Sequence, residues 1–233
     1  MISPAEFIPT LLNYHLLYKL DLYMFEQVCQ EVKVRHDHGL PLMPVSVNFS
    51  RQDFDHADIA GEMDRIYDKY GMDEYVDKSY FIVEITEQDI AVGAEGLREQ
   101  LKRIRENGYR LWLDDFGSGY SAINMFSQFE FDLIKYDMDL LKHLDDHGGA
   151  NRLILTELVY TARKLGIHTL VEGVETEDQL MFVKDIGCEL AQGFFFHKPE
   201  PLDEILFRTR DASKIRICET PEEREEMNRK WLE

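Results

Sequence analysis

The sequence has 233 residues, of which 44% are hydrophobic and 30% are charged, a composition typical of one soluble globular domain. With 26 Lys and Arg against 45 Asp and Glu, the formal net charge is −19, which argues against nonspecific binding to DNA, RNA or an anionic membrane. No apolar run approaches the roughly 20 residues that span a bilayer. The three cysteines, Cys29, Cys188 and Cys218, lack metal-binding or redox spacing, which predicts reduced thiols in a cytoplasmic protein.

Helical patterns and short apolar runs alternate along the chain. The first segment, residues 4–36, predicts one or two helices. Nearly continuous apolar runs predict buried strands at residues 42–50, 80–86, 110–116, 131–137, 168–174 and 189–196. The segments between and after them predict helices at residues 55–70, 92–107, 120–128, 150–165, 176–186 and 203–210.

Continuously apolar strands joined through helices are typical of parallel βαβ units, in which both faces of the sheet are covered. We therefore expect an α/β fold of the TIM-type (β/α)8 barrel kind. The barrel is expected to be incomplete, because about six strands are predicted and eight are required. The missing strands belong at the N-terminal end, where the sequence begins with a helical pattern. We predict one domain over residues 1–210 and a charged C-terminal tail over residues 211–233.

Polar residues stand at the C-terminal end of one predicted strand after another. In chain order they are Asn48, Glu84, Asp114 with Asp115, Lys135, Glu172 and Gln192. Because the catalytic groups of parallel α/β barrels lie at this rim, we expect these side chains to converge. Carboxylate and amide oxygens are ligands that suit Mg²⁺ or Mn²⁺. The adjacent carboxylates of Asp114 and Asp115 repel each other unless a cation lies between them, which favours a pair of divalent ions acting on a phosphodiester.

Simpler explanations compete for several of these residues. An isolated Asp-Asp pair is more often a helix cap and a solvated turn residue. Lys135 could be only an ion-pair partner of the acidic side chains, and a polar residue at a strand end, such as Gln192, need have no role. Glu87 could cap the segment that follows it.

Two other segments have simple interpretations. His36 and His38 lie in a polar stretch that predicts a solvated loop rather than a metal site. The rings of Phe194–Phe196 could stack on a base, but we expect at least two of the three to be buried in the barrel.

The segments VNFS, VEITE, LDDFGSGYSA, IKYD, VEGVET and AQGFFFHKP resemble, in order and spacing, the motifs of EAL domains. These domains are bacterial phosphodiesterases that linearise cyclic di-GMP to pGpG. The opening SPAEFIPTL resembles the P-x-x-FIP segment of the family, so the resemblance extends to about residue 207. It implies a barrel that hydrolyses cyclic di-GMP with two divalent cations, Mg²⁺ or Mn²⁺.

The resemblance also implies the metal ligands. Asn48, Glu84 and Asp114 would bind the first ion. Asp114 would bridge to the second ion, and Asp115 and Glu172 would complete the protein ligands of that ion. These carboxylates would therefore belong to the catalytic machinery.

Further roles follow from the same resemblance. Lys135 would assist the nucleophilic water, and Gln192 would position nearby groups or substrate. Glu87 and Glu175 would hold the loop after the Asp-Asp pair in its competent shape. Members of the family commonly form homodimers beside that loop and often follow a sensory or diguanylate cyclase domain.

The sequence departs from the family in one respect, because no Glu-Ala-Leu motif precedes the FIP segment. The glutamate of that motif would be a further ligand of the first metal ion. We expect the motif to lie in a segment upstream of this chain, because the downstream motifs are intact. The alternatives are a module that binds cyclic di-GMP without hydrolysing it, an inactive fragment, or an unrelated barrel metalloenzyme.

Overall fold

The computed structural model describes residues 3–40, 42–91, 95–117, 125, 128–142, 144 and 149–199. The helices and strands are, in chain order, α1 (Pro4–Asn13), α2 (Leu17–Asp37), β1 (Val45–Asn48), α3 (Arg51–His56), α4 (Ile59–Lys69), η1 (Met72–Glu74), η2 (Lys78–Tyr80), β2 (Phe81–Thr86), α5 (Glu87–Ala91), α6 (Glu95–Glu106), β3 (Arg110–Phe116), β4 (Leu133–Tyr136), α8 (Asp139–Lys142), α9 (Ala150–Lys164), β5 (His168–Val171), α10 (Glu177–Asp185) and β6 (Leu190–Ala191). The predicted helix at 203–210, the tail at 211–233 and most of the predicted helix at 120–128 lie outside the described residues.

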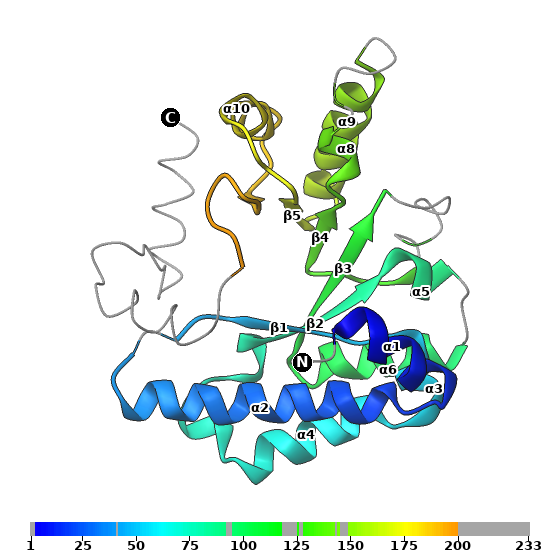
Figure 1. The fold of residues 1–233 in the computed structure, drawn as a ribbon, viewed down its shortest axis with the longest axis vertical. Helices are drawn as coiled ribbons and strands as arrows, with labels where there is room; N and C mark the ends of the chain where they lie inside the picture. The colour runs from blue at the N-terminus through cyan, green and yellow to red at the C-terminus, as the bar shows by residue number, and fades with distance from the viewer. Residues whose placement is uncertain are drawn as a thin grey trace.

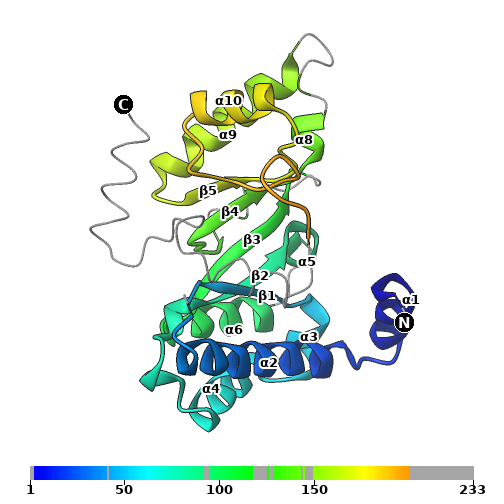
Figure 2. The same cartoon turned by 60° about the vertical axis from the view of Figure 1, so that its left-hand side comes forward.

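Six strands form one parallel sheet in the order β1-β2-β3-β4-β5-β6, so each strand pairs with the next along the chain (Figure 1). Parallel neighbours require a crossover, and helices supply it between β1 and β2, β2 and β3, β4 and β5, and β5 and β6. Within the described part of the chain, β1 and β6 each pair with one strand, so the sheet is not closed there. The sheet is curled and forms a half-barrel (Figure 2). The predicted α/β fold with six parallel strands is confirmed.

The hydrophobic core lies between the sheet and the helices on its outer face. Alternate residues of the strands, such as Val83 and Ile85 of β2 and Leu111 and Leu113 of β3, are fully buried in it. The side chains of the intervening strand positions point to the opposite face. This alternation leaves the polar strand-end residues on the inner side of the sheet, away from the helices.

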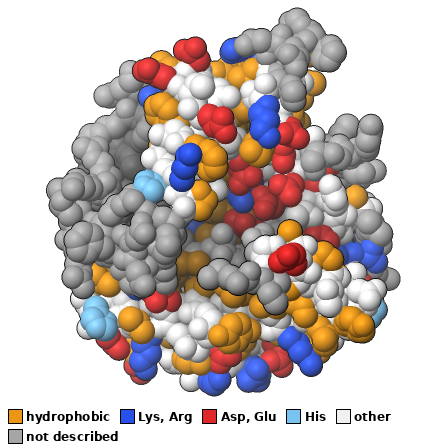
Figure 3. Space-filling view, viewed as in Figure 1, with side chains coloured by type: hydrophobic (Ala, Val, Ile, Leu, Met, Phe, Trp, Pro, Cys, Tyr) orange, Lys and Arg blue, Asp and Glu red, His pale blue; other side chains and the backbone are white. Residues whose placement is uncertain are grey.

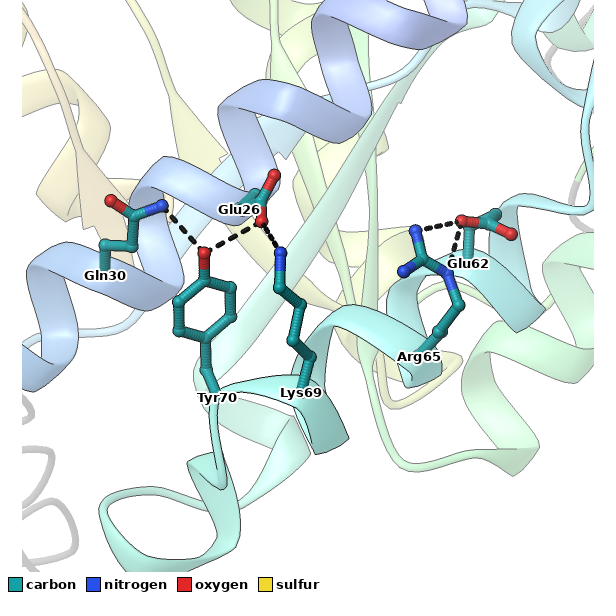
Figure 4. Close-up of polar contacts among 6 residues, drawn as sticks. All are labelled: Glu26, Gln30, Glu62, Arg65, Lys69 and Tyr70. Atoms are coloured by element: carbon teal, nitrogen blue, oxygen red, sulfur yellow. Dashed lines mark hydrogen bonds and ion pairs between the residues drawn. The ribbon is translucent and has the colours of Figure 1, made fainter.

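Two long helices, α2 and α4, lie side by side beneath β1 and β2 (Figure 1). Glu26 of α2 accepts hydrogen bonds from Lys69 Nζ at 2.5 Å and from the Tyr70 hydroxyl at 2.8 Å (Figure 4). Gln30 Nε2 donates to the same hydroxyl at 2.9 Å. These contacts supplement the apolar packing of the two helices.

Helix boundaries differ from the prediction at three places. The expected helix at 55–70 is two helices, because the backbone of Ala57 is extended and Asp58 then caps α4 by accepting from the Gly61 N–H. The expected helix at 92–107 is preceded by the separate short helix α5. His36 lies in the last turn of α2, and His38 is the residue that ends the helix. Both side chains are exposed, so the segment is solvated, but the prediction of a loop is wrong.

The last strand is shorter than predicted, because β6 ends at Ala191. The chain then turns, with the Phe196 and His197 N–H groups donating to Gly193 O. Phe194, Phe195 and Phe196 consequently project from a turn and are 55%, 43% and 52% exposed. The prediction that at least two of these rings are buried is wrong.

Two further observations concern the cysteines and the length of the apolar helices. Of the described cysteines, Cys29 is buried, Cys188 is half-buried and both are free thiols. Within the described ranges, the structure contains no helix with the length and apolar character needed to cross a bilayer.

Candidate metal centre

Lys135 lies at the centre of a cluster of carboxylates drawn from neighbouring strands. Its Nζ is 2.8 Å from Asp114 Oδ1, 2.9 Å from Glu172 Oε1 and 3.2 Å from Glu84 Oε2. Glu84 comes from β2, Asp114 from β3 and Lys135 from β4, and Glu172 directly follows β5. On the face of the molecule seen in Figure 3, acidic side chains gather in a hollow. The predicted convergence of these four residues is confirmed by their positions.

A β-bulge explains how both adjacent aspartates reach this cluster. The pairing of β3 with β4 shifts between Leu113 and Phe116, where Asp114 and Asp115 together lie opposite Lys135. In a regular strand two adjacent side chains point to opposite faces of the sheet. Asp115 instead has φ 52°, a left-handed conformation that aspartate adopts more readily than most residues.

Asp114, Asp115 and Glu172 form, within the described residues, a group that could hold a cation. One carboxylate oxygen from each lies within 4.8 Å of the others, and all three side chains are half-buried. Burial raises the pKa of Asp115, and the charges of Asp114, Asp137 and Glu172 raise it further. Burial also raises the pKa of Glu172, although Lys135 opposes this change. An all-oxygen group whose members repel one another suits a hard divalent cation.

Glu84 and Lys135 form the buried part of the cluster, with 4% and 7% of their surfaces exposed. Burial raises the pKa of Glu84, Lys135 lowers it, and the charge of Asp114 raises it again. Burial alone would lower the pKa of Lys135, but Glu84, Asp114 and Glu172 raise it above its ordinary value. Lys135 is therefore protonated at neutral pH and is the cation of the group.

Asn48 lies at the same edge of the sheet. It ends β1 in register with Glu84, and the N–H of the next residue, Phe49, donates to Glu84 O at 2.9 Å. Asn48 is exposed, because β1 is the first strand of the sheet. The structure thus places Asn48 beside Glu84 at the solvent-facing side of the cluster.

Glu87 is buried, with 1% of its surface exposed, and its Oε2 accepts the Gly117 N–H at 2.9 Å. Gly117 follows β3 directly, so Glu87 holds the first residue of the loop after the aspartate pair. Gly117 has φ 103°, and a Cβ there would lie 2.8 Å from Leu140. Residues 118–124 of this loop lie outside the described residues.

Glu175 follows Glu172 by three positions and Gln192 directly follows β6, and both are exposed. The Gln192 backbone donates to Val171 O at 2.9 Å and accepts the Val174 N–H at 3.0 Å, which fixes the segment between β5 and β6. The Glu175 N–H donates to Gln179 Oε1 at 2.8 Å. The proposed roles of these two side chains stay predictions.

Sequence reasoning missed two polar residues of the cluster. Asp137 follows β4 two positions after Lys135, and its charge raises the pKa of Asp115. Ser46 precedes Asn48 by two positions, and the interaction of its side chain with Glu84 lowers the pKa of that carboxyl. Both could have been found from the two-residue period of a strand, which puts each on the same face as a predicted site residue.

A parallel half-barrel with carboxylates at the ends of consecutive strands defines a barrel-type protein with an acidic rim. The EAL domain family matches residues 1–199, and the chain belongs to that family. The uncharacterized protein y4lL of Sinorhizobium fredii is 32% identical over 94% of this chain and 25% of its own length. MucR of Pseudomonas aeruginosa, a bifunctional diguanylate cyclase/cyclic di-GMP phosphodiesterase, is 26% identical over 88% of this chain. The chain covers 29% of MucR, so it spans less than a third of either relative.

Solved structures share the fold. The PaMucR phosphodiesterase in complex with c-di-GMP has a TM-score of 0.78 and 26% identity, over 88% of this chain and 81% of that one. A manganese and cyclic di-GMP complex of Klebsiella pneumoniae BlrP1 has a TM-score of 0.66 and 28% identity, over 78% of this chain and 45% of that one. The likeness supports a TIM-type barrel of which this sheet forms the larger part.

Proposed function

We propose that this chain hydrolyses cyclic di-GMP to linear pGpG, using two divalent cations, Mg²⁺ or Mn²⁺, held at the ends of its parallel strands. The observation that carries the proposal is the convergence of Glu84, Asp114 and Glu172 on Lys135, with Asp115 brought alongside by the bulge. Similar proteins are named as cyclic di-GMP phosphodiesterases, and one similar structure is a manganese complex.

The ligands divide between the two ions. Asn48, Glu84 and Asp114 would hold the first ion, and Asp114, Asp115 and Glu172 would hold the second. When bound, the two ions would stabilise charge on the phosphoryl group and acidify the attacking water. Oxygen-only ligands and the raised pKa values of Glu84, Asp115 and Glu172 support this assignment.

Lys135 and Asp115 would have different roles toward the attacking water molecule. Because Lys135 is protonated, it does not remove a proton, and it would orient the nucleophilic water by donating a hydrogen bond. The carboxylate of Asp115 would accept the proton of this water. Attack by the water breaks one phosphodiester P–O bond, and the proton passes finally to the leaving ribose oxygen.

The remaining predicted residues would act around this chemistry. Glu87 and Glu175 would shape the loop after Asp115, and Gln192 would position substrate. We also propose a homodimer beside that loop, an upstream sensory or diguanylate cyclase domain, and a cytoplasmic location. The chain covers 29% of MucR, a share that supports a further domain without placing it upstream or downstream. The division at residue 210 between domain and tail remains part of the proposal.

The test is incubation of the chain with cyclic di-GMP and Mn²⁺, with pGpG measured by chromatography. We expect turnover that EDTA abolishes, and we expect Asp115→Asn to lower turnover by about 100-fold or more, because it loses a ligand and a proton acceptor. Asp55→Asn, at an exposed position of α3, is the matched control and should retain activity. Binding of cyclic di-GMP without pGpG would contradict hydrolysis and assign a receptor role.

A further inference from the structure

The short helix α5 contacts the segments that follow two neighbouring strands. It begins directly after β2 and lies near the ends of β2 and β3, close to α3 (Figures 1 and 2). At its first residue, Glu87 binds the Gly117 N–H beyond the end of β3. Two residues later, Asp89 reaches in the other direction, to the segment beyond the end of β1.

The two carboxylate oxygens of Asp89 accept hydrogen bonds from different parts of the chain. Oδ2 accepts the Thr86 hydroxyl at 2.6 Å, and the Asp89 N–H donates to the same hydroxyl at 3.2 Å. This reciprocal pair caps α5 and is local. Oδ1 accepts the Arg51 N–H at 3.1 Å, across 38 positions of sequence. The contact between Asp89 and the Arg51 N–H is not needed to cap α5.

The Arg51 N–H is the first of α3, and only Phe49 and Ser50 separate it from Asn48. Phe49 is buried in the core, and its N–H donates to Glu84 O. The segment from Asn48 to Arg51 is therefore held by β2 at one end and by Asp89 at the other. Gln100 of α6 fixes the far end of α3, because its Nε2 donates to Phe54 O at 2.7 Å.

The position of β1 in the sheet makes this contact important. Among the described strands, β1 pairs only with β2, whereas β2 to β5 each pair with two neighbours. In the described part of the chain, β1 therefore has backbone hydrogen bonds to a neighbouring strand on one side only. The bond from Asp89 to the Arg51 N–H adds a restraint from outside the sheet on the segment that follows Asn48.

We propose that Asp89 is a positioning residue for Asn48, acting through the Arg51 N–H as Glu87 acts on the loop after β3. The inference rests on the proposed metal centre in one respect. If Asn48 is a ligand there, its positioning by Asp89 raises the affinity for the divalent cation. Partners that orient metal ligands typically change affinity by about 10- to 100-fold when removed.

The test compares Asp89→Ala, Asp89→Asn and the control Asp55→Ala, which changes an exposed carboxylate of α3 that lies 3.7 Å from Arg51 Nε. In the metal-free protein, NMR reports the Asn48 side-chain amide and hydrogen exchange of the Arg51 N–H. We expect Asp89→Ala to shift the Asn48 signals and to speed exchange at Arg51 by about 5- to 10-fold. Asp89→Asn keeps an acceptor for Arg51 and should restore both.

Manganese affinity is then measured by electron paramagnetic resonance of the free ion. Asp89→Ala should raise the dissociation constant by about 10-fold relative to Asp55→Ala. Unchanged Asn48 signals, or an affinity equal to that of the control, would overturn the positioning role. If the wild-type chain binds no Mn²⁺, the NMR comparison decides the role of Asp89, and the metal centre of the proposed function is contradicted separately.

Discussion

Lys135 neutralises a group of carboxylates that would otherwise repel one another in a partly buried space. Its ammonium contacts Glu84, Asp114 and Glu172 at 2.8 to 3.2 Å. Removing one partner of a buried ion pair typically costs about 3 to 5 kcal/mol, because the other charges stay buried and unpaired. At this scale the same residue serves stability and the proposed chemistry.

Lys135→Met should therefore lower the free energy of unfolding in EDTA by about 3 kcal/mol, measured by urea denaturation. Added Mn²⁺ should recover part of the loss by supplying another cation to the carboxylates. Lys142→Met, at an exposed lysine paired with Asp139, is the control and should show no measurable change. Equal stability of Lys135→Met and the wild type in EDTA would contradict this role.

Asp21 and Asp53 form a second carboxyl pair, between α2 and α3. Asp53 is fully buried, and its Oδ2 accepts the Ser50 N–H at 2.5 Å. Burial, and then the charge of Asp53, raise the pKa of Asp21 to about 8. Because the folded pKa is above the unfolded value, the pair stabilises the protein fully below about pH 4, and this contribution is lost as the pH rises through about 8.

Asp21→Asn keeps a hydrogen-bond donor for Asp53 but cannot ionise. We expect the variant to be the more stable, by a margin that grows as the pH rises from 5 through about 8, because the folded wild type must keep a proton on Asp21 that the unfolded chain has already lost. Urea denaturation at pH 5, 7 and 9 measures the difference. A difference that does not change with pH would show that Asp21 does not titrate in this range.

At the scale of elements, α2 and α4 are joined by the Tyr70 hydroxyl, which bonds both Glu26 and Gln30 (Figure 4). Tyr70→Phe keeps the ring and removes these bonds, so the free energy of unfolding should fall by about 1 kcal/mol. Arg65→Ala, which removes an exposed contact to Glu62 within α4, should leave the urea midpoint unchanged. A midpoint for Tyr70→Phe equal to that of Arg65→Ala would contradict the contribution of this contact.

The elements also show what the sequence could predict. Strands covered on both faces are continuously apolar, so β2 and β3 are visible as runs, and the polar residue that ends each run marks the rim. The bulge at Asp115 depends on how β3 pairs with β4, which no single segment encodes. The exposed position of Phe194–Phe196 depends on where β6 stops pairing, and an apolar run alone does not show this.

At the scale of the whole molecule, the net charge of −19 bears on the proposed cation centre. The positive charge of Lys135 lowers the pKa values of Glu84 and Glu172. Burial raises them by more, so both stay above their ordinary values. A divalent cation that binds only the folded state raises the unfolding midpoint with its concentration. We expect Mn²⁺ to raise the thermal midpoint of the wild type, and to raise it less in Asp115→Asn.

The most direct measurement is anomalous X-ray diffraction from crystals of the chain grown with Mn²⁺. We predict two anomalous peaks, the first ion on the side of Glu84 and Asn48 and the second among the carboxylates of Asp114, Asp115 and Glu172. Crystals of Asp115→Asn should lose the peak of the second ion. Saturating Mn²⁺ with no anomalous density at this rim, and with Lys135 still bound to all three carboxylates, would contradict the account.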